Sequence, residues 1–203
     1  MVENTSIKQL NITLLLKQPM ESLPNKKEIG EALNIPEEEV NNSLSIEVPG
    51  GNKIFAFPSQ TKEFIFEPQR VRINDKSGKS IDESDIVNDF KKIFDKFIPA
   101  DSVVAYGYNF DIVLSTKDEI KPADLVSDKV LKNFGKTKIL ESGIRITLEK
   151  DNAKFDFQLI PTGNNKQQFL HLNIHIDEHV IPEDLKKDFK KYYDEASNFY
   201  SNF

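Results

Sequence analysis

The sequence predicts an α+β fold: one or more antiparallel sheets with helices packed on one face. Several segments alternate apolar and polar residues with a period of two, which is typical of strands buried on one side. Other segments place apolar residues at helical spacing. Both kinds of segment follow the order β-α-β-β-β-α in residues 1–99 and again in residues 100–203. We therefore expect a duplicated unit, whose halves form two domains or one continuous domain.

The composition is that of a folded globular chain. Hydrophobic residues make up 38% of the 203 residues and charged residues 30%, and 15 Phe with 5 Tyr can fill a large core. The net charge is −6, which disfavours contact with nucleic-acid phosphates and with anionic lipid. We therefore expect neither a nucleic acid nor a membrane as a partner.

The absence of cysteine excludes disulfides, iron–sulfur clusters, thiolate zinc sites and a cysteine nucleophile. No window approaches about 20 apolar residues, and the first 17 residues lack the pattern of a signal peptide. We expect a soluble, cytoplasmic protein. Only 3 of the 27 basic residues are Arg, and there are 17 Asn, a bias that indicates an AT-rich prokaryotic or phage genome.

The first half shows one strand pattern, two short helices and then more strands. Asn25 and Glu28 are spaced as a capping box, Pro36 opens a second helical turn, and Gly50-Gly51 suits a hairpin turn. The expected elements are a strand over 10–16, helices beginning near 26 and 37, strands over 43–48, 53–57 and 63–73 with an interruption at Pro68, and an amphipathic helix over 82–97.

The second half begins with the strongest strand pattern in the chain, at residues 102–115. A helix is expected from Pro122 to Phe134, with Gly135 as its C-terminal cap. The remaining expected elements are a hairpin of strands 139–149 and 153–160, a polar loop at 161–166, a strand over 169–177 and a closing helix over 182–203.

Residues 27–44 are similar to the helix-turn-helix pattern of bacterial DNA-binding proteins. The second helix of that motif should meet phosphates with basic or amide side chains. Here it offers Glu37, Glu38 and Glu39, which repel a polyanion. A short helix pair that covers a sheet explains the segment more simply.

All three histidines lie between His171 and His179. On an extended strand His171 and His175 would be roughly 13 Å apart, too far for one metal ion with bonds of about 2 Å. His175 and Asp177 could supply two ligands, but outside residues 171–179 the sequence offers no His or Cys to complete the site. A strand with one polar face is the favoured interpretation, and no cofactor is expected.

Arg70 and Arg72 share one face of the predicted strand 63–73. Paired Arg side chains recognise carboxylates or phosphates by bidentate contacts. Asn109 and Asp111, on the small-residue face of strand 102–115, could lie nearby and complete a site for an anion or partner. The simpler interpretation is cross-strand ion pairing with an acidic neighbour.

The terminal helix stays aromatic to its end, with Phe199, Tyr200 and Phe203. Because chain ends normally fray, aromatic residues there indicate docking, either on the chain's own sheet or on a partner. No phosphate-binding glycine loop or nucleophile motif is present, although 33 acidic residues leave a carboxylate-based enzyme open.

The outline resembles a sporadically distributed family of uncharacterised prokaryotic proteins. The resemblance rests on the Arg-containing strand Phe66–Asp75, on Tyr106-Gly107-Tyr108-Asn109-Phe110, and on a late alternating strand ending at Asp177 before a long helix. It implies no activity.

The sequence therefore favours a non-enzymatic protein-interaction or assembly module that self-associates. The first alternative is a small-molecule or anion-binding protein, or an enzyme of unrecognised type, with a site between the halves at Arg70, Arg72, Asn109 and Asp111. The second alternative is a DNA-binding regulator that uses residues 27–44.

Overall fold

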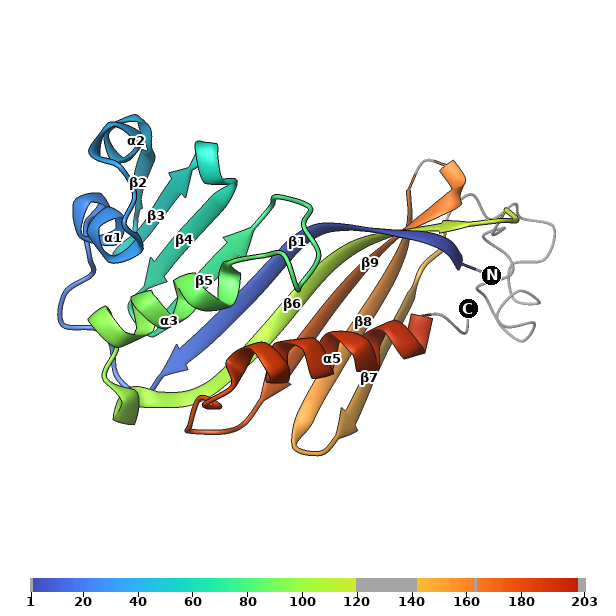
Figure 1. Ribbon diagram of the computed structural model, residues 1–203. Coiled ribbons are helices and arrows are strands. Elements are labelled where there is room, and N and C mark those ends of the chain that lie inside the picture. Colours follow the sequence, from blue (N-terminus) through green and yellow to red (C-terminus); the bar gives the residue numbers. More distant parts are fainter. Residues whose placement is uncertain (1, 120–141, 163, 201–203) are drawn as a thin grey trace.

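The computed structural model describes residues 2–119, 142–162 and 164–200, which form one antiparallel sheet with helices packed on one face (Figure 1). The strands are β1 (Val2–Leu16), β2 (Leu44–Val48), β3 (Asn52–Phe57), β4 (Lys62–Glu67), β5 (Arg70–Asp75), β6 (Val103–Thr116), β7 (Ile144–Lys150), β8 (Ala153–Thr162) and β9 (Asn164–Ile176). The described helices are α1 (Lys26–Leu33), α2 (Glu37–Asn42), α3 (Ile86–Phe97) and α5 (Leu185–Tyr200), with the 3-10 turns η1 (Pro58–Gln60) and η2 (Ala100–Ser102).

The two longest strands lie beside each other at the centre of the sheet. The strand order is β2-β3-β4-β5-β1-β6-β9-β8-β7, with β1 of 15 residues and β6 of 14. β1 pairs with β5, and β6 pairs with β9, so each half starts with a strand that pairs with the last strand of that half. A helix follows in both halves, α3 after β5 and α5 after β9. The expected duplication stays a prediction, because shared connectivity alone does not establish it.

Alternation along β1 and β6 separates an apolar face from a polar one. Leu10 and Ile12 in β1 are at most 1% exposed, and so are Tyr108 and Phe110 in β6. The register places Leu10 opposite Phe110 and Ile12 opposite Tyr108. The apolar sides of the two strands therefore coincide, and the helices cover that side (Figure 1).

The predicted apolar stripes of the long helices are confirmed. Phe90 and Ile93 of α3 are buried, as are Phe189 and Tyr192 of α5. The ring centroid of Phe189 lies 4.9 Å from that of Tyr108 and 5.0 Å from that of Phe110. α5 thus packs directly onto β6, one of the two strands at the centre of the sheet. The pairing of aromatic rings stabilises this contact in addition to the burial of apolar area.

Two tyrosines of β6 also bind α5 through hydrogen bonds. The hydroxyl of Tyr108 donates to Asp188 Oδ2 at 2.7 Å, and the hydroxyl of Tyr106 donates to the same oxygen at 3.4 Å. Burial, reinforced by the negative charge of Asp188, raises the pKa of both tyrosines well above the usual value. The phenols therefore stay protonated and remain donors across the accessible pH range.

The predicted N-terminal cap of α1 and the predicted glycine turn between β2 and β3 are confirmed. The Asn25 side chain accepts hydrogen bonds from the backbone of residues 27 and 28, and the Glu28 carboxylate accepts one from the Asn25 backbone, which completes the capping box. Gly50 and Gly51 take φ values of 98° and 81° in the β2–β3 turn, a region that glycine enters without strain.

Several predicted boundaries differ from the structure. The expected strand 63–73 is a hairpin, β4 and β5, because Pro68 cannot donate to a ladder and the chain reverses there. The expected loop 161–166 is wrong: Pro161 pairs with Gln168 in the ladder, so β8 and β9 extend into this polar stretch. α3 begins at Ile86 rather than at residue 82, after a turn in which the Ile86 amide donates to Ser84 Oγ. The predicted helix 122–134 and residues 139–141 lie outside the described residues.

No helix in the described part of the chain is long and apolar enough to cross a membrane.

A nearly buried ion pair joins β4 to α3. Lys62 Nζ contacts the Asp89 carboxylate, and the two side chains are only 11% and 10% exposed. Removing one member of such a pair leaves the other charge without its partner and with little access to water, which is more damaging than losing the attraction alone.

We predict that Asp89→Ala lowers the free energy of unfolding by about 3–5 kcal/mol, because Lys62 loses its counter-charge in a nearly dry position. Urea denaturation measures the change. Asp95→Ala, an exposed position on the same helix, is the matched control and should change stability by less than about 0.5 kcal/mol. The double change Lys62→Met with Asp89→Leu should recover most of the loss. Equal effects of Asp89→Ala and Asp95→Ala would contradict this account.

Candidate functional site

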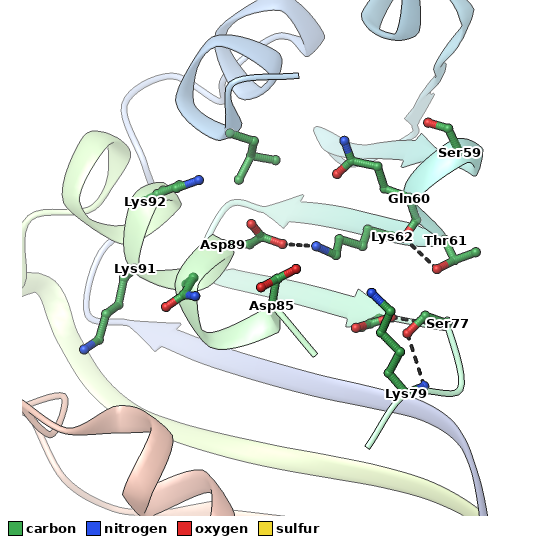
Figure 2. Close-up of a pocket in the computed structure, with 13 residues that line it drawn as sticks. Ser59, Gln60, Thr61, Lys62, Ser77, Lys79, Asp85, Asp89, Lys91 and Lys92 are labelled. Atoms are coloured by element: carbon green, nitrogen blue, oxygen red, sulfur yellow. Dashed lines mark hydrogen bonds and ion pairs between the residues drawn. The ribbon is translucent and has the colours of Figure 1, made fainter. Parts of the chain in front are cut away.

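A polar pocket of about 860 Å³ opens beside α3 (Figure 2). Its walls come from the first half of α3, the end of α1, η1 with the start of β4, and the end of β5 with the loop that follows. The lining residues are Leu33, Ser59, Gln60, Thr61, Lys62, Asp75, Ser77, Lys79, Asp85, Asn88, Asp89, Lys91 and Lys92. The volume falls within the usual range of small-molecule sites.

The buried charges of the pocket are already paired. Lys62 and Asp89 form the ion pair described above, which Figure 2 shows in the middle of the pocket. Asp75 is 2% exposed and accepts hydrogen bonds from the Ser84 hydroxyl and, at 2.8 Å, from the Ser77 amide. These contacts fix the geometry of the wall before any ligand arrives.

The exposed charges of the pocket are largely unpaired. Lys79 and Lys92 form no ion pair with any residue that the structure describes, and the Asp85 carboxylate is likewise without such a partner there. Lys91 differs, because its Nζ donates to the Glu183 carbonyl oxygen at 3.0 Å. The pocket therefore offers two ammonium groups and one carboxylate to a ligand.

Sequence reasoning did not find this pocket. Its residues come from four segments between residues 33 and 92, and none of these segments contains a recognisable motif. The alternation of apolar residues places Lys62 at a strand start, but only the strand register and the docking of α3 bring it to Asp89.

The ligand site predicted at Arg70, Arg72, Asn109 and Asp111 lies on the opposite side of the sheet, which we call the helix-free face because it carries no helix among the described residues. All four side chains belong to this face. The two arginines are on β5 and the other two residues on β6, with β1 between these strands. The structure thus places them on one open surface of the sheet, and their role in ligand binding stays a prediction.

Both arginines contact the same carboxylate. Arg70 binds Glu67 through Nε and Nη2, and Arg72 Nη2 donates to Glu67 Oε1 at 3.1 Å. The hydrogen bond from Arg70, together with the positive charge of Arg72, holds the pKa of Glu67 below its usual value. Both arginines therefore form ion pairs with an acidic neighbour, as the simpler interpretation of the sequence anticipated, although the buried Nε of Arg72 has no hydrogen-bond partner among the described residues.

A row of amides crosses the centre of the helix-free face. The register aligns Asn74, Asn11, Asn109 and Asn173 on four successive strands. Asn109 Nδ2 donates to Asn11 Oδ1 at 2.5 Å, and Asn11 Nδ2 donates to Asn74 Oδ1 at 2.6 Å. Asn11 is only 3% exposed, so this chain of hydrogen bonds satisfies groups that water does not reach.

Asp111 contacts a histidine rather than an arginine. His171 Nδ1 lies 2.6 Å from Asp111 Oδ1, across the β6–β9 pair. Their hydrogen bond raises the pKa of His171, against the opposing effect of burial. Gly107 lies on the same face of β6, where a β-carbon would come within 2.4 Å of the Ile174 carbonyl oxygen, so only glycine fits that close approach of β9.

The metal ligands considered from the sequence, His175 and Asp177, bind each other. His175 Nε2 lies 2.8 Å from Asp177 Oδ1, and Lys154 Nζ lies 3.3 Å from Asp177 Oδ2. Among the residues that the structure describes, no group of three or more His, Asp or Glu side chains could hold a metal ion.

An apolar surface lies at the β2 edge of the sheet. β2 is exposed along its whole length, and Leu44, Ile46 and Val48 are 57%, 50% and 37% exposed. Ile46 stands opposite Ile54, which stands opposite Ile65, and the last two are half-buried. We call these five residues the edge patch. The sequence showed β2 as a strand, but its position at the edge follows from the strand order alone.

The aromatic interface predicted at the chain end is not placed. The side chains of Phe199 and Tyr200, and all of Phe203, lie outside the described part of the structure. The helix-turn-helix-like segment 27–44 contains α1 and α2, and the six residues of α2 begin with Glu37, Glu38 and Glu39.

No protein-family model matches the chain, and no curated protein matches it. The resemblance to an uncharacterised prokaryotic family therefore stays a prediction.

The His171–Asp111 pair predicts a pH-dependent contribution to stability. Because folding raises the pKa of His171, its contribution is complete below the unfolded pKa of about 6.5 and is lost as the pH rises through the folded pKa. We expect His171→Asn to lower the free energy of unfolding by about 1 kcal/mol or less near pH 5.5, since the side chain is 34% exposed. The deficit should shrink toward pH 8.

Urea denaturation at a series of pH values measures this difference. His179→Asn, at an exposed position, is the matched control and should leave the pH profile of the wild type unchanged. A deficit in His171→Asn that grows as the pH rises would have the wrong sign and would contradict the assignment.

Proposed function

We propose that this protein is a non-enzymatic interaction module that self-associates, and that a second copy of the chain pairs along β2. The observation that carries the proposal is the edge patch. Three of its aliphatic side chains, which are 57%, 50% and 37% exposed, belong to β2, a strand that pairs with β3 on one side and has no neighbour on the other. The scarcity of Arg and the abundance of Asn favour a prokaryotic or phage origin, and the proposal includes a cytoplasmic location.

Physical chemistry favours strand addition at such an edge. Alternate residues of an edge strand direct their N–H and C=O groups outward, where they can pair with another strand. Edges are normally protected by charge, proline or a bulge. Here β2 has one charged residue, Glu47, and Lys53 Nζ lies 3.7 Å from that carboxylate. The remaining edge therefore resembles an interface more than a protected boundary.

The sequence of β2 is self-complementary in one antiparallel register. Centred on Ile46, that register sets Leu44 of each copy opposite Val48 of the other, and Ser45 opposite Glu47. All aliphatic side chains then share one face, and the Glu47 side chains do not stand opposite each other. The half-buried Ile54 and Ile65 extend the same apolar face within each copy.

The effect of salt distinguishes a second copy of this chain from a basic protein as the partner. Each copy carries −6, so two copies repel each other at long range, and added salt screens that repulsion. Self-association should therefore strengthen with ionic strength, whereas binding to a basic protein should weaken.

We predict that the wild type forms a dimer and that Ile46→Lys is monomeric, because the substitution places two ammonium groups opposite each other at the centre of the pairing. Sedimentation velocity from about 1 µM to about 1 mM protein covers the relevant affinities. Leu148→Lys, which changes a 42% exposed side chain on the other edge strand β7, is the matched control and should remain dimeric.

The fold should tolerate Ile46→Lys, since half of that side chain is already exposed, and an unchanged urea midpoint checks this. A wild type that stays monomeric over the whole concentration range, or a dimer that survives Ile46→Lys, would reject the proposal.

A further inference from the structure

We infer that the pocket beside α3 binds a small organic phosphate that carries hydroxyl groups. This site is separate from the edge patch: it is lined by α3, η1 and the loop after β5, and it contains no residue of β2. The inference does not depend on self-association.

The lining of the pocket carries one more positive than negative charge, although the protein as a whole is acidic. Four lysines and three aspartates line it, while the whole chain carries −6. A concave surface concentrates the field of the charges on its walls, so this difference in sign favours an anion here over most of the remaining surface.

The three aspartates do not oppose the anion equally. Asp89 is neutralised by Lys62, and the carboxylate oxygens of Asp75 each accept a hydrogen bond from Ser77 or Ser84. Of the three aspartates, Asp85 alone has no hydrogen-bond or ion-pair partner for its carboxylate among the described residues, and it suits a ligand hydroxyl as an acceptor.

Two ammonium groups are available for the phosphate. Lys79, in the loop after β5, and Lys92, on α3, lie on opposite sides of the pocket and have no ion-pair partner among the residues described (Figure 2). Lys62 keeps further N–H donors beyond the one that Asp89 accepts. A phosphate dianion beside either group would accept charge-assisted hydrogen bonds from it, and the other group would contact the hydroxyl-bearing end of the ligand.

Neutral donors complete the chemistry of the site. Gln60 and Asn88 supply amides, and Ser59, Thr61 and Ser77 supply hydroxyl groups. These groups suit the hydroxyls of a sugar or polyol, and the carbon atoms of the wall suit the carbon skeleton of such a ligand. The phosphate would give affinity, and the hydroxyl contacts would give orientation.

Isothermal titration calorimetry on the full chain tests the inference with four probes at matched ionic strength: glucose 6-phosphate, glycerol 3-phosphate, inorganic phosphate and glucose. We expect saturable binding of at least one organic phosphate and none of glucose. Lys79→Gln and Lys92→Gln should each weaken binding about tenfold, because each removes one charge-assisted contact. Asp85→Asn should weaken the binding of the organic phosphate but not the binding of inorganic phosphate.

Lys154→Gln is the matched control, since it removes one positive charge from the exposed surface of β8, four strands from β5 and away from the pocket. It should leave binding unchanged, and so should Ile46→Lys, which keeps this test independent of self-association. No binding of any phosphate probe tighter than about 10 mM would overturn the inference. Equal weakening by Lys154→Gln and Lys79→Gln would also overturn it, because the effect would then be one of overall charge.

Discussion

The pairing of β1 with β6 is the constraint on which the rest of the structure depends. Each strand alternates apolar and polar residues, and their register sets Ile12 opposite Tyr108 on one side and Asn11 opposite Asn109 on the other. A shift of one residue would bring leucines onto the asparagine row and expose the core. The fixed register therefore decides which side of the whole sheet the helices cover, because β5 and β9 continue the same alternation outward.

The candidate sites lie outside the paired strands β1 and β6, so the register of that pair does not by itself determine which residues meet there. The pocket is formed where α3 meets the β3–β4 connection and the end of β5, and the Lys62–Asp89 pair holds those parts together. The edge patch lies at the β2 edge of the sheet, four strands from β1, where β2 has no outer neighbour. The helix-free face pairs most of its central polar groups internally, as with Arg70 and Glu67 or His171 and Asp111, so it leaves fewer of them to a ligand.

Strong local sequence patterns made the helices and strands predictable. The contacts between distant elements were not predictable from such patterns. The leucines of β1, the capping box at Asn25 and the aromatic stripe of α5 each reflect contacts within a few residues, which a sequence displays directly. The ion pair of Lys62 with Asp89 spans 27 residues and depends on register and helix docking together. The edge position of β2 depends on β1 pairing between β5 and β6, a long-range choice that no local pattern encodes. For the same reason the sequence suggested that Arg70 and Asp111 lie close together. It could not show that β1 lies between their strands, β5 and β6.

Hydrogen–deuterium exchange at low and high protein concentration tests the central claim most directly, namely that β2 is an interface between two copies. The account predicts that the backbone amides of residues 44–48 exchange more slowly at the high concentration, while those of the other edge strand, residues 144–150, exchange at the same rate at both. Protection in the central strands β1 and β6 should be high throughout. Unchanged exchange at residues 44–48 at a concentration where the protein is dimeric would contradict the account, because the copies would then associate through another surface.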